Sequence, residues 1–416
     1  MQLKTYPKYM DSGIQWIGNI PEWWGVRKLK YNYDIIGKTN IPASEGNEEE
    51  DFPFFTSGES IKYIGKPVIN GEYIIVGDGG IPNFKYYKGE FSYSDHCFLL
   101  KTNKKTFTKF LYYLLIGNIE TLNILCFHGM GLRNLDKYKF NSFFSNVPPL
   151  SEQTAIANFL DKKTVRVDVL IEKDKKLIEL LKERRTALIN HVVTRGLDPN
   201  VKLKDSGIEW IGKIPEGWEV HKLKYKTIIN KKKLEDDTNP NYVINYLDIS
   251  NVDSSGNILD IEEQIFEDAP SRARRIPRSG DIILSTVRTY LKAIAYLEDI
   301  PSNLIVSTGF AVLEPIKSIN SKYLFYSTSS EVFIQNVIAY SKGVAYPAIN
   351  PSELGQVPII IPPLIEQTTI ANFLDKATAK IDKTIKKIEE KIALLEEYKK
   401  SLIHHVVTGK VDVREV

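Results

Sequence analysis

The chain has 416 residues, of which 43% are hydrophobic and 26% are charged, and its formal net charge is +3. This composition excludes a disordered or fibrous protein and provides enough apolar residues for two or three hydrophobic cores. Because the net charge is small, the total does not indicate a nucleic-acid partner, and any DNA-binding surface has to be a local patch.

The first recognisable element is a short motif, DSGIQWIGNIPEWW, at residues 11–24. It recurs at 205–218 as DSGIEWIGKIPEGW, with three differences in fourteen positions. Such a recurrence indicates that one structural unit occurs twice. Each copy carries a pair of tryptophans, and we predict that these pack in the core against helix ends rather than form a ligand site. They are Trp16 and Trp24 in the first copy and Trp210 and Trp218 in the second.

Residues 25–147 form a first variable region, which we predict to be a mixed sheet with a helix towards its end. Strand-like runs such as those at 73–76 and 91–100 are separated by Gly, Pro and Asn, and a helical pattern covers 107–125. A glycine turn at 129–131 follows the helix and leads into a last strand.

The most site-like cluster of this region is GDGG at 77–80 together with Asp95 and His96. One interpretation is an acid/base pair or a hydrolytic centre. The other is a Gly-rich turn followed by a histidine at a strand edge that faces DNA or solvent. We favour the second interpretation, since nothing equivalent to GDGG occurs in the second half of the sequence.

A long helix is predicted from residue 148, where the sequence PPLSEQTAIANFLDK begins. Two prolines exclude a helix arriving from upstream, Ser151 is a good N-cap, and Glu and Gln follow in the first turn. Thr164 marks either a break or a second cap. Beyond it, apolar residues recur in steps of three and four, which predicts a coiled-coil seam interrupted at Asp174 and Arg185. The seam residues are Val167, Ile171, Ile178, Leu181 and Leu188.

The same helix occurs again at an offset of 214 residues, as PPLIEQTTIANFLDK at 362–376 with two differences in fifteen positions. Its seam is interrupted only at Lys399 and consists of Ile381, Ile385, Ile388, Ile392, Leu395 and Leu402. Two repeats that pair through equivalent faces about a pseudo-two-fold axis have antiparallel helices. Helices of about 40 residues form a rod of roughly 60 Å, which we expect to hold the two variable regions at a fixed distance.

Between the two helices, a polar linker at 195–204 precedes the second motif and the second variable region, 219–361. The motif recurs at an offset of 194 and the helix at 214, so the second region holds about twenty extra residues. We place them between Trp218 and about Asn320, because the helical pattern at 321–339 already matches its first copy at the 214 offset. The two variable regions are therefore predicted to share one fold.

An arginine-rich segment at 271–292 is the best candidate for DNA contacts, with a solvated surface loop as the alternative. Guanidinium groups suit phosphate oxygens and guanine edges, and small hydroxyls suit phosphates. We expect Arg274 and Arg288 to contribute to binding. The candidates in the second region are Arg272, Arg274, Arg275, Arg278, Ser285, Arg288, Tyr290, Lys292, Lys342 and Tyr346. Weaker candidates in the first region are Lys62, Lys66, Lys85, Tyr86, Lys88, Arg133 and Asn134.

Motifs for catalysis are missing from the sequence. It has no G-x-x-x-x-G-K-[ST] phosphate loop and no Asn/Asp-Pro-Pro-aromatic methyltransferase tetrad. The six histidines show no metal-ligand spacing, and His404 and His405, near a helix end, are expected to be solvated or stabilised by the helix dipole. Cys97 and Cys126 give neither a disulfide framework nor a zinc spacing, and MQLKTYPKYMDSG lacks the apolar segment of a signal peptide. We therefore predict a cytoplasmic chain without catalytic, cofactor-binding or metal-binding residues of its own.

This order of modules resembles the specificity subunit of a type I restriction-modification system. The resemblance covers nearly the whole chain and rests on DSGI-x-WIG-x-IP-E before each variable region and PPL-x-EQ-x-x-IA-x-FLD at the start of each helix. It implies an α+β fold with two pseudo-symmetric repeats, each a mixed α/β target-recognition domain followed by a long helix, and the two helices packed as an antiparallel coiled coil. The implied divisions are 1–24, 25–147, 148–194, 195–218, 219–361 and 362–416.

In that family each target-recognition domain reads one half of an asymmetric bipartite DNA sequence, and the helices set the spacer and bind two modification subunits. The resemblance further implies that adenine methylation with S-adenosylmethionine belongs to the modification subunits. ATP- and Mg-dependent translocation and cleavage of unmodified DNA, the basis of antiphage defence, belong to the restriction subunits. This chain is then a non-catalytic, DNA-binding subunit.

The residues alone leave two alternatives open. One is a coiled-coil scaffold that spaces two protein-binding domains; the arginine-rich segment and the divergence of the two variable regions count against it, and a measurement of DNA binding with a steep salt dependence would separate the two. The other is a nuclease centred on Asp78, Asp95 and His96, which predicts activity in the isolated chain.

Overall fold

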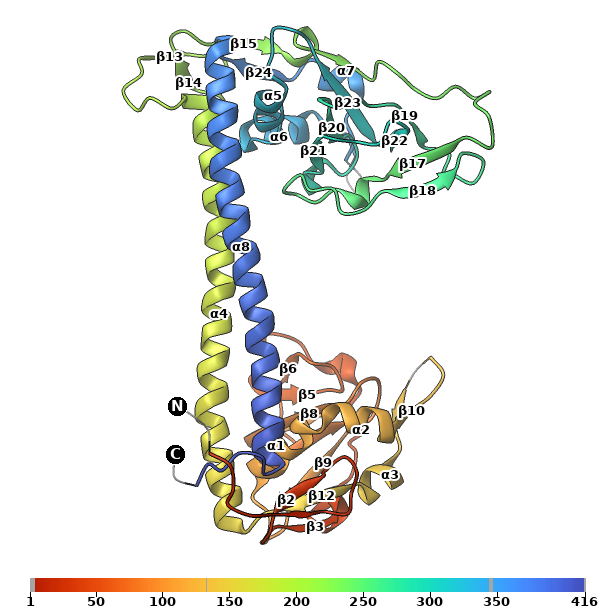
Figure 1. Cartoon of the computed structure of the whole chain (residues 1–416), viewed down its shortest axis with the longest axis vertical. Helices are drawn as coiled ribbons and strands as arrows, with labels where there is room; N and C mark the ends of the chain where they lie inside the picture. The colour runs from red at the N-terminus through yellow and green to blue at the C-terminus, as the bar shows by residue number, and fades with distance from the viewer. Residues whose placement is uncertain (1–3, 132, 344–346, 415–416) are drawn as a thin grey trace. The chain divides into compact units, whose positions relative to one another are not determined.

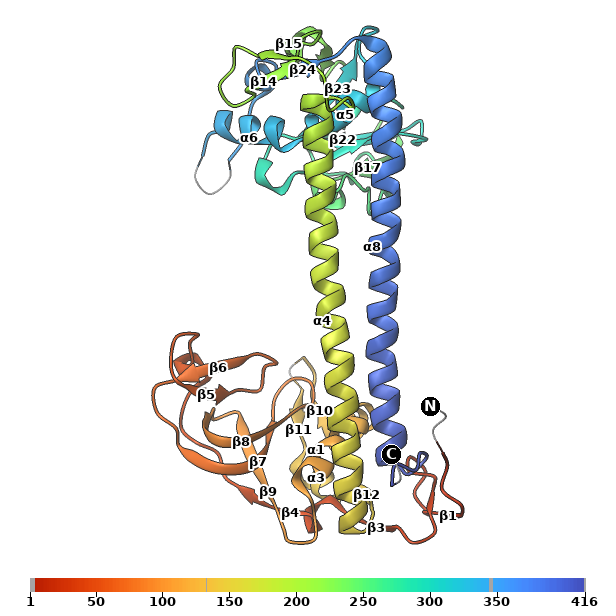
Figure 2. The same cartoon turned by 90° about the vertical axis from the view of Figure 1, so that its left-hand side faces the viewer.

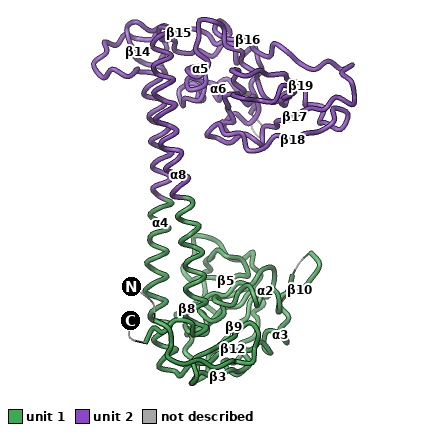
Figure 3. The backbone as a smooth tube through the Cα atoms, viewed as in Figure 1, with its two compact units in different colours: residues 1–175, 389–416 green, residues 176–388 purple. Residues whose placement is uncertain are grey.

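The computed structural model describes residues 4–131, 133–343 and 347–414 of the chain. The chain forms two compact units, of which unit 1 contains residues 1–175 and 389–416 and unit 2 contains residues 176–388 (Figure 3). Each unit therefore consists of one variable region with a segment of both long helices. These two helices are α4 (Leu150–Arg195) and α8 (Leu364–Val407).

The elements of unit 1 follow the chain from a short hairpin to the start of α4. Its strands are β1 (Tyr9–Asp11), β2 (Asn19–Pro21), β3 (Gly25–Lys28), β4 (Tyr33–Ile36), β5 (Phe52–Phe55), β6 (Ile61–Ile64), β7 (Ile69–Gly77), β8 (Asn83–Tyr93), β9 (Cys97–Thr102), β10 (Phe127–His128), β11 (Asn134–Leu135) and β12 (Phe144–Val147). Its shorter helices are α1 (Thr108–Gly117), α2 (Ile119–Cys126) and α3 (Lys137–Ser142), with 3-10 turns η1 (Leu29–Tyr31) and η2 (Ala43–Glu45).

Unit 2 begins and ends with the same elements as unit 1, but its intervening strands are arranged differently. Its strands are β13 (Leu203–Asp205), β14 (Lys213–Pro215), β15 (Glu219–Lys222), β16 (Thr227–Ile229), β17 (Val243–Leu247), β18 (Glu262–Ile265), β19 (Ala273–Arg275), β20 (Ile282–Ser285), β21 (Ile294–Tyr296), β22 (Leu304–Ser307), β23 (Phe310–Pro315) and β24 (Pro358–Ile361). Its helices are α5 (Ser321–Thr328), α6 (Glu331–Tyr340) and α7 (Pro351–Leu354), with 3-10 turns η3 (Leu223–Tyr225), η4 (Ile249–Asn251) and η5 (Thr289–Leu291).

Both units are built on the same antiparallel frame. Its strand order is β4-β9-β7-β8 in unit 1 and β16-β23-β20-β21 in unit 2. Ile74 pairs with Leu100 in the first frame and Ile282 with Leu313 in the second, and all four side chains are completely buried. Helix α1 packs against β7 and β8, and α5 packs against β20 and β21 (Figure 1). The opposite face of each frame packs in a second apolar cluster, which contains Ile75 in unit 1 and Ile283 in unit 2. Burial of both faces explains why the central strands are continuous apolar runs rather than alternating ones.

Outside the frame the two units differ. In unit 1, β5 pairs in parallel with β8 and carries the edge strand β6, which extends the frame to six strands. In unit 2, four strands form a separate sheet in the order β18-β17-β22-β19 around its own apolar clusters. This second sheet includes segments between Trp218 and Asn320, where the extra residues were predicted.

Helices α4 and α8 lie side by side and run antiparallel within each unit (Figures 1 and 2). The seam residues named above are all buried or partly buried. Each polar interruption of the seam is neutralised by an ion pair between the helices. The pairs are Asp174 with Lys391 (2.8 Å), Asp168 with Lys399 (2.6 Å) and Arg185 with Asp382 (3.0 Å). Residue numbers rise along one helix as they fall along the other, so the predicted fold class with an antiparallel coiled coil is confirmed.

Helix α4 differs from the prediction in two places. The N–H of Glu152 donates to the carbonyl of Pro149 at 2.9 Å, so the first turn closes early and Ser151 lies inside the helix instead of capping it. The helix also continues through Thr164, whose buried hydroxyl donates to the carbonyl of Leu160 at 2.8 Å. A helix accommodates this bond to the preceding turn. The predicted N-cap and the predicted break were therefore both wrong.

A glutamate in the first turn of each long helix binds tryptophans of the preceding motif, which explains why the motif recurs together with the helix. Glu152 accepts hydrogen bonds from the indole nitrogens of Trp23 at 2.5 Å and Trp24 at 2.9 Å. In unit 2, Glu366 accepts one from Trp218 at 2.9 Å. Trp24 and Trp218 are each 1% exposed, so for these two tryptophans the predicted core packing against a helix end is confirmed.

The adjacent glutamine links each long helix to the variable region before it. Gln153 is 1% exposed, accepts from the N–H of Phe107 at 2.8 Å and donates to the carbonyl of Pro148 at 2.9 Å. Gln367, also 1% exposed, accepts from the N–H of Asn320 at 2.8 Å in unit 2. Buried backbone groups that have no partner in the sheet or helix are thus satisfied by a side chain that recurs in both repeats.

A tyrosine–aspartate bond also recurs, and it corrects the predicted alignment of the repeats. The hydroxyl of Tyr113 donates to Asp161 at 2.8 Å, and that of Tyr326 donates to Asp375 at 2.8 Å. The aspartates are 214 residues apart, but the tyrosines are 213 apart. The helices of the variable regions therefore do not keep the 214 offset, and the loops around them absorb the difference.

Replacing Gln153 with Ala is expected to lower the free energy of unfolding of unit 1 by about 2–6 kcal/mol. The substitution leaves the N–H of Phe107 and the carbonyl of Pro148 buried without their partner, and each such group costs about 1–3 kcal/mol. Denaturant unfolding followed by circular dichroism measures the difference. The control is Lys162→Ala, which removes an exposed side chain from the same helix. Equal stability of the two variants would show that this bond does not hold the domain to the helix.

Candidate nucleic-acid interface

A concave surface on unit 2 brings together loops that are far apart in the sequence. The loops follow β17, precede β19, follow β20 and join β22 to β23, and they enclose a cavity of about 640 Å³, named here the arginine cavity. Arg272 and Arg288, both predicted DNA-contact residues, line it together with Asp248. Ser250, Ser307 and Thr308 add polar groups to the lining. The arrangement combines two cations with neutral hydrogen-bonding groups, as nucleic-acid contacts require.

Arg272 is held in position by two side chains, one from strand β17, which lies beyond β22 in the sheet, and one from the turn after β17. Its Nε donates to Asp248 at 2.9 Å and to the hydroxyl of Tyr246 at 3.1 Å. That hydroxyl itself donates to Asp248 at 2.7 Å. The hydrogen bond to Tyr246 and the charge of Asp248 raise the pKa of Arg272. Burial opposes ionisation of Asp248, but hydrogen bonds from Tyr246 and Ser250 and the charge of Arg272 lower its pKa overall.

The loop around η5 has two residues with left-handed backbone. Arg288 has φ +49° and Lys292 has φ +56°, a conformation that costs energy for residues other than glycine. Between them, Tyr290 and Leu291 are half exposed. The loop therefore presents a cation and two large side chains on a backbone that the surrounding structure has to hold in place.

The base of this loop is fixed by buried hydroxyls. Ser285 donates from its Oγ to the carbonyl of Val287 at 2.6 Å, and Thr286 donates from its Oγ1 to the carbonyl of Gly309 at 2.8 Å. The N–H of Arg288 donates to the carbonyl of Pro347 at 2.8 Å. Ser285 is buried, so in this structure its hydroxyl supports the loop and is not available to a phosphate.

The remaining arginines of the predicted cluster are not brought to the arginine cavity. The guanidinium of Arg274 lies 4.7 Å from the ring centre of Phe266. Arg275 is partly buried, and this burial lowers its pKa. Arg278 is exposed, beyond the end of β19. The sequence cluster is therefore divided among several surfaces.

Two predicted lysines of unit 2 are engaged in ion pairs. Lys292 contacts Glu331 at 2.6 Å and Lys342 contacts Glu353 at 2.5 Å. The lysine of the second pair has an 81% exposed side chain, so a DNA phosphate can replace the Glu353 carboxylate as its partner at little cost. Tyr346 lies outside the described residues.

In unit 1 the predicted DNA-contact residues on β8 have different environments. The ammonium of Lys85 donates to the carbonyls of Thr56 and Gly58, and burial lowers its pKa. Tyr86 donates to Glu72 at 2.7 Å, and burial raises its pKa. Lys88 is exposed. Successive residues of a strand face opposite sides, so this run does not form one basic patch.

The other candidates of unit 1 are also mostly structural. Lys62 donates to the carbonyl of Ala43 at 3.0 Å, while Lys66 is exposed. Arg133 closes the turn after α2 by donating to the carbonyls of Asn123 and Phe127, both at 2.6 Å. Asn134 lies on β11 and is exposed. The exposed set in unit 1 is thus smaller than the sequence suggested.

The GDGG loop is a structural turn with internal contacts. Asp78 contacts the ammonium of Lys38 at 2.5 Å and lies 3.6 Å from Nδ1 of His96. Asp95 donates its N–H to the carbonyl of Ile41 at 2.9 Å. Within the described parts of the chain, no group of three or more His, Cys, Asp or Glu side chains is placed to hold a metal ion.

This loop has a structural counterpart in unit 2, contrary to the prediction from sequence. The N–H of Leu135 donates to the carbonyl of Asp78 at 2.9 Å, and the N–H of Ile349 donates to that of Thr286 at 2.9 Å. The GDGG loop and the loop that carries Arg288 therefore occupy the same place in the two frames. Their equivalence lies in backbone hydrogen bonds, which leave no shared side-chain motif in the sequence.

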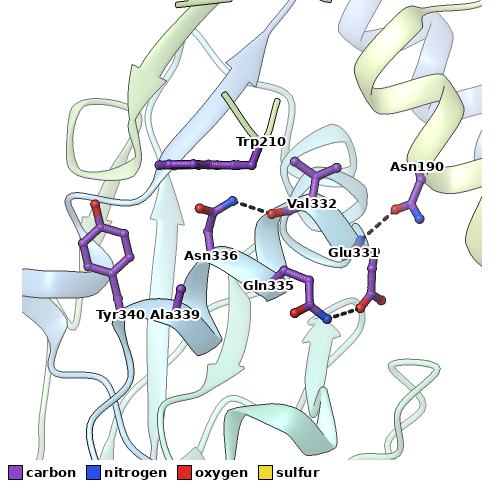
Figure 4. Close-up of a pocket in the computed structure, with 8 residues that line it drawn as sticks. All are labelled: Asn190, Trp210, Glu331, Val332, Gln335, Asn336, Ala339 and Tyr340. Carbon is purple, nitrogen blue, oxygen red and sulfur yellow. Dashed lines mark hydrogen bonds between the residues drawn. The ribbon is translucent and has the colours of Figure 1, made fainter. Parts of the chain in front are cut away.

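Trp210 also departs from its predicted role. It is 52% exposed and faces α6 across a cavity of about 770 Å³ (Figure 4). In unit 1, Trp16 stacks on Phe143 with ring centres 5.3 Å apart. The residue that follows Phe143 by 214 positions is Val357, which offers no ring, so the second indole is not held in the core. The residues that line the cavity include Glu331 but no lysine or arginine, and it is not suited to a phosphate.

Sequence reasoning missed the residues that position Arg272. Asp248 comes directly after β17 and caps η4 by accepting from the N–H of Ser250 at 3.3 Å. An aspartate at the end of an apolar strand is a recognisable turn signal. No sequence signal connects it to an arginine more than twenty residues later.

Comparison with known proteins identifies the family. The family model of the type I restriction modification DNA specificity domain matches the chain twice, at residues 21–182 and 215–394. The MjaVIII specificity subunit of Methanocaldococcus jannaschii is 29% identical over 295 residues, which cover 69% of this chain and 67% of the relative. The EcoDI specificity subunit of Escherichia coli is 23% identical over 391 residues, covering 89% and 85%.

Solved structures show the same fold. A chain from a study of complex assembly and conformational transition in a type I R-M system matches with a TM-score of 0.67 at 16% identity, covering 93% of this chain and 98% of that one. The HsdS subunit from Thermoanaerobacter tengcongensis matches with a TM-score of 0.51 at 16% identity, covering 94% and 98%. No helix of the described residues is long and apolar enough to span a membrane. With two matches of the family model that together cover most of its length, the chain belongs to the family of type I restriction-modification DNA specificity subunits.

Proposed function

We propose that this specificity subunit binds a bipartite, asymmetric DNA target, with one half read by each variable domain. The observation that carries the proposal is a frame built twice with different exposed loops. The same buried glutamine and glutamate contacts support both domains, whereas the equivalent loops carry Gly80 in unit 1 and Arg288 in unit 2. Two half-sites of different sequence require different side chains on one scaffold.

We further propose that the chain works through partners and carries out no catalysis itself. Two modification subunits dock on it and methylate adenine with S-adenosylmethionine. Restriction subunits that use ATP and Mg join them, and the assembly then cleaves unmodified DNA in the cytoplasm. The specificity subunits among its relatives and the fold shared with a chain of a type I R-M system support this assembly.

The helix pair is proposed to set the spacer between the two half-sites. Helices α4 and α8 are continuous over 46 and 44 residues, which correspond to about 65–70 Å of helix. Their interhelical ion pairs fix the register in which they pack.

Methylome sequencing of a host that expresses this chain with its modification partner tests the proposal. We expect an adenine-methylated motif with two defined halves and a spacer of fixed length, and we expect it to disappear when this chain is deleted. Methylation of a single continuous sequence would contradict the bipartite target. Methylation that persists without this chain would exclude it as the specificity subunit.

A further inference from the structure

We propose that Arg272 reads a guanine in the half-site bound by the second variable domain, and that Asp248 and Tyr246 are positioning residues for it. This inference rests on the proposed function and assigns one base contact within it. It follows from which nitrogens of the guanidinium are engaged.

The contacts of Arg272 fix the plane of its guanidinium and leave its outer edge for a ligand. Asp248 and Tyr246 both bind Nε. Within the part of the chain that the structure describes, Nη1 and Nη2 have no hydrogen-bond partner, and the side chain is 57% exposed. Those two nitrogens form a fork of parallel donors that matches two neighbouring acceptors.

Guanine is the base that fits this fork. On its major-groove edge it presents two acceptors, O6 and N7, whereas adenine presents an acceptor beside a donor. A phosphate also accepts two parallel hydrogen bonds, but the carboxylate of Asp248 lies 2.9 Å from the guanidinium and offsets its charge. The pair therefore attracts a phosphate less than a lone arginine does, while its donor geometry is unchanged. A fixed plane favours base reading because specificity depends on orientation.

Asp248 is already fully used in holding Arg272 and its own turn. One carboxylate oxygen accepts from Tyr246 and Arg272, and the other accepts from the N–H and the hydroxyl of Ser250. Its low pKa keeps it charged at neutral pH. The aspartate therefore acts on DNA through the arginine and not as a reading group itself.

The support continues behind the arginine. The carbonyl of Arg272 accepts from the N–H of Thr308 at 2.7 Å, which ties it to the turn that leads to Gly309. A Cβ at Gly309 would lie 2.3 Å from the Cδ1 of Ile249, in the turn that Asp248 caps. The turn behind the Arg272–Asp248 pair is thus packed against the Ile249 side chain, and the backbone bond to Thr308 limits movement of the fork.

The test compares methylome motifs of the complete assembly containing wild-type chain, Arg272→Ala, Asp248→Asn or Tyr246→Phe. We expect Arg272→Ala to accept any base at one G·C position of a single half-motif, with discrimination at that position reduced about ten- to a hundredfold. Tyr246→Phe and Asp248→Asn should relax the same position to a smaller degree. The matched control is Lys317→Ala, which removes one exposed charge at the other end of β23 and should leave the motif unchanged.

Each other outcome overturns the inference in a distinct way. If the wild-type half-motif contains no G·C pair, or if Arg272→Ala keeps every base preference, Arg272 does not read guanine. If Arg272→Ala instead weakens binding equally for all sequences and lowers the salt dependence by about one phosphate contact, its partner is a phosphate. If the wild-type assembly yields no bipartite motif, the proposed function fails and this inference fails with it.

Discussion

Exchanging residues 219–361 for the corresponding domain of another family member is expected to change one half of the methylated sequence and leave the other half and the spacer as they were. The exchange points are suited to this because the ends of the domain meet. Glu219 pairs with Ile361 and Lys222 with Pro358 in the sheet of β15 and β24. A graft joined within this strand pair therefore keeps the connections of the domain to the preceding linker and to helix α8.

The donor domain has to retain the groups that contact helix α8. Tyr326 donates to Asp375, and the N–H of Asn320 donates to Gln367. The reciprocal exchange of residues 25–147 is the control, since Gly25 pairs with Val147 at the base of the first domain in the same way. It should change only the other half of the motif. Sequencing the methylomes of both chimaeras measures the result, and a change in both halves from a single exchange would refute independent reading by the two domains.

The parts of this structure that the sequence predicts are those that recur in it. Periodicity indicated the long helices and their seam because each apolar position is repeated every turn or two and contacts the partner helix. The recurrence of Glu and Gln after the Pro-Pro pair marked them as constant, although their role was not evident. The structure explains it: Gln153 and Gln367 bind the backbone N–H groups at the N-terminal ends of α1 and α5 in the variable domains, more than forty residues upstream.

The candidate site was less predictable because its geometry depends on contacts between distant strands. The parallel pairing of β17 with β22 brings Asp248 near the turn at Thr308, and the antiparallel pairing of β19 with β22 adds Arg272. Charge and residue type selected this arginine but also Arg274 and Arg275, which have different surroundings. Composition shows which side chains can bind DNA, whereas the fold decides which of them are exposed and held in place.

Adding one heptad to both long helices is expected to lengthen the spacer of the methylated motif by about three base pairs. Seven residues add about 10 Å of helix, and each base pair adds about 3.4 Å. The insertions are placed after Leu170 in α4 and after Glu396 in α8. These positions face each other between the ion pairs Asp168–Lys399 and Asp174–Lys391. A heptad keeps the seam in register, so the helices should still pack.

Two comparisons separate the length of the helices from the length of the chain. Seven Gly-Ser residues inserted after Asn200, in the exposed linker beyond α4, extend the chain without extending either helix and should leave the spacer unchanged. A heptad inserted in α4 alone displaces its seam against α8 and separates the charges of Asp174 and Lys391, so we expect loss of assembly and of methylation. If the double insertion assembles and methylates with the original spacer, the helix pair does not determine the distance between the half-sites.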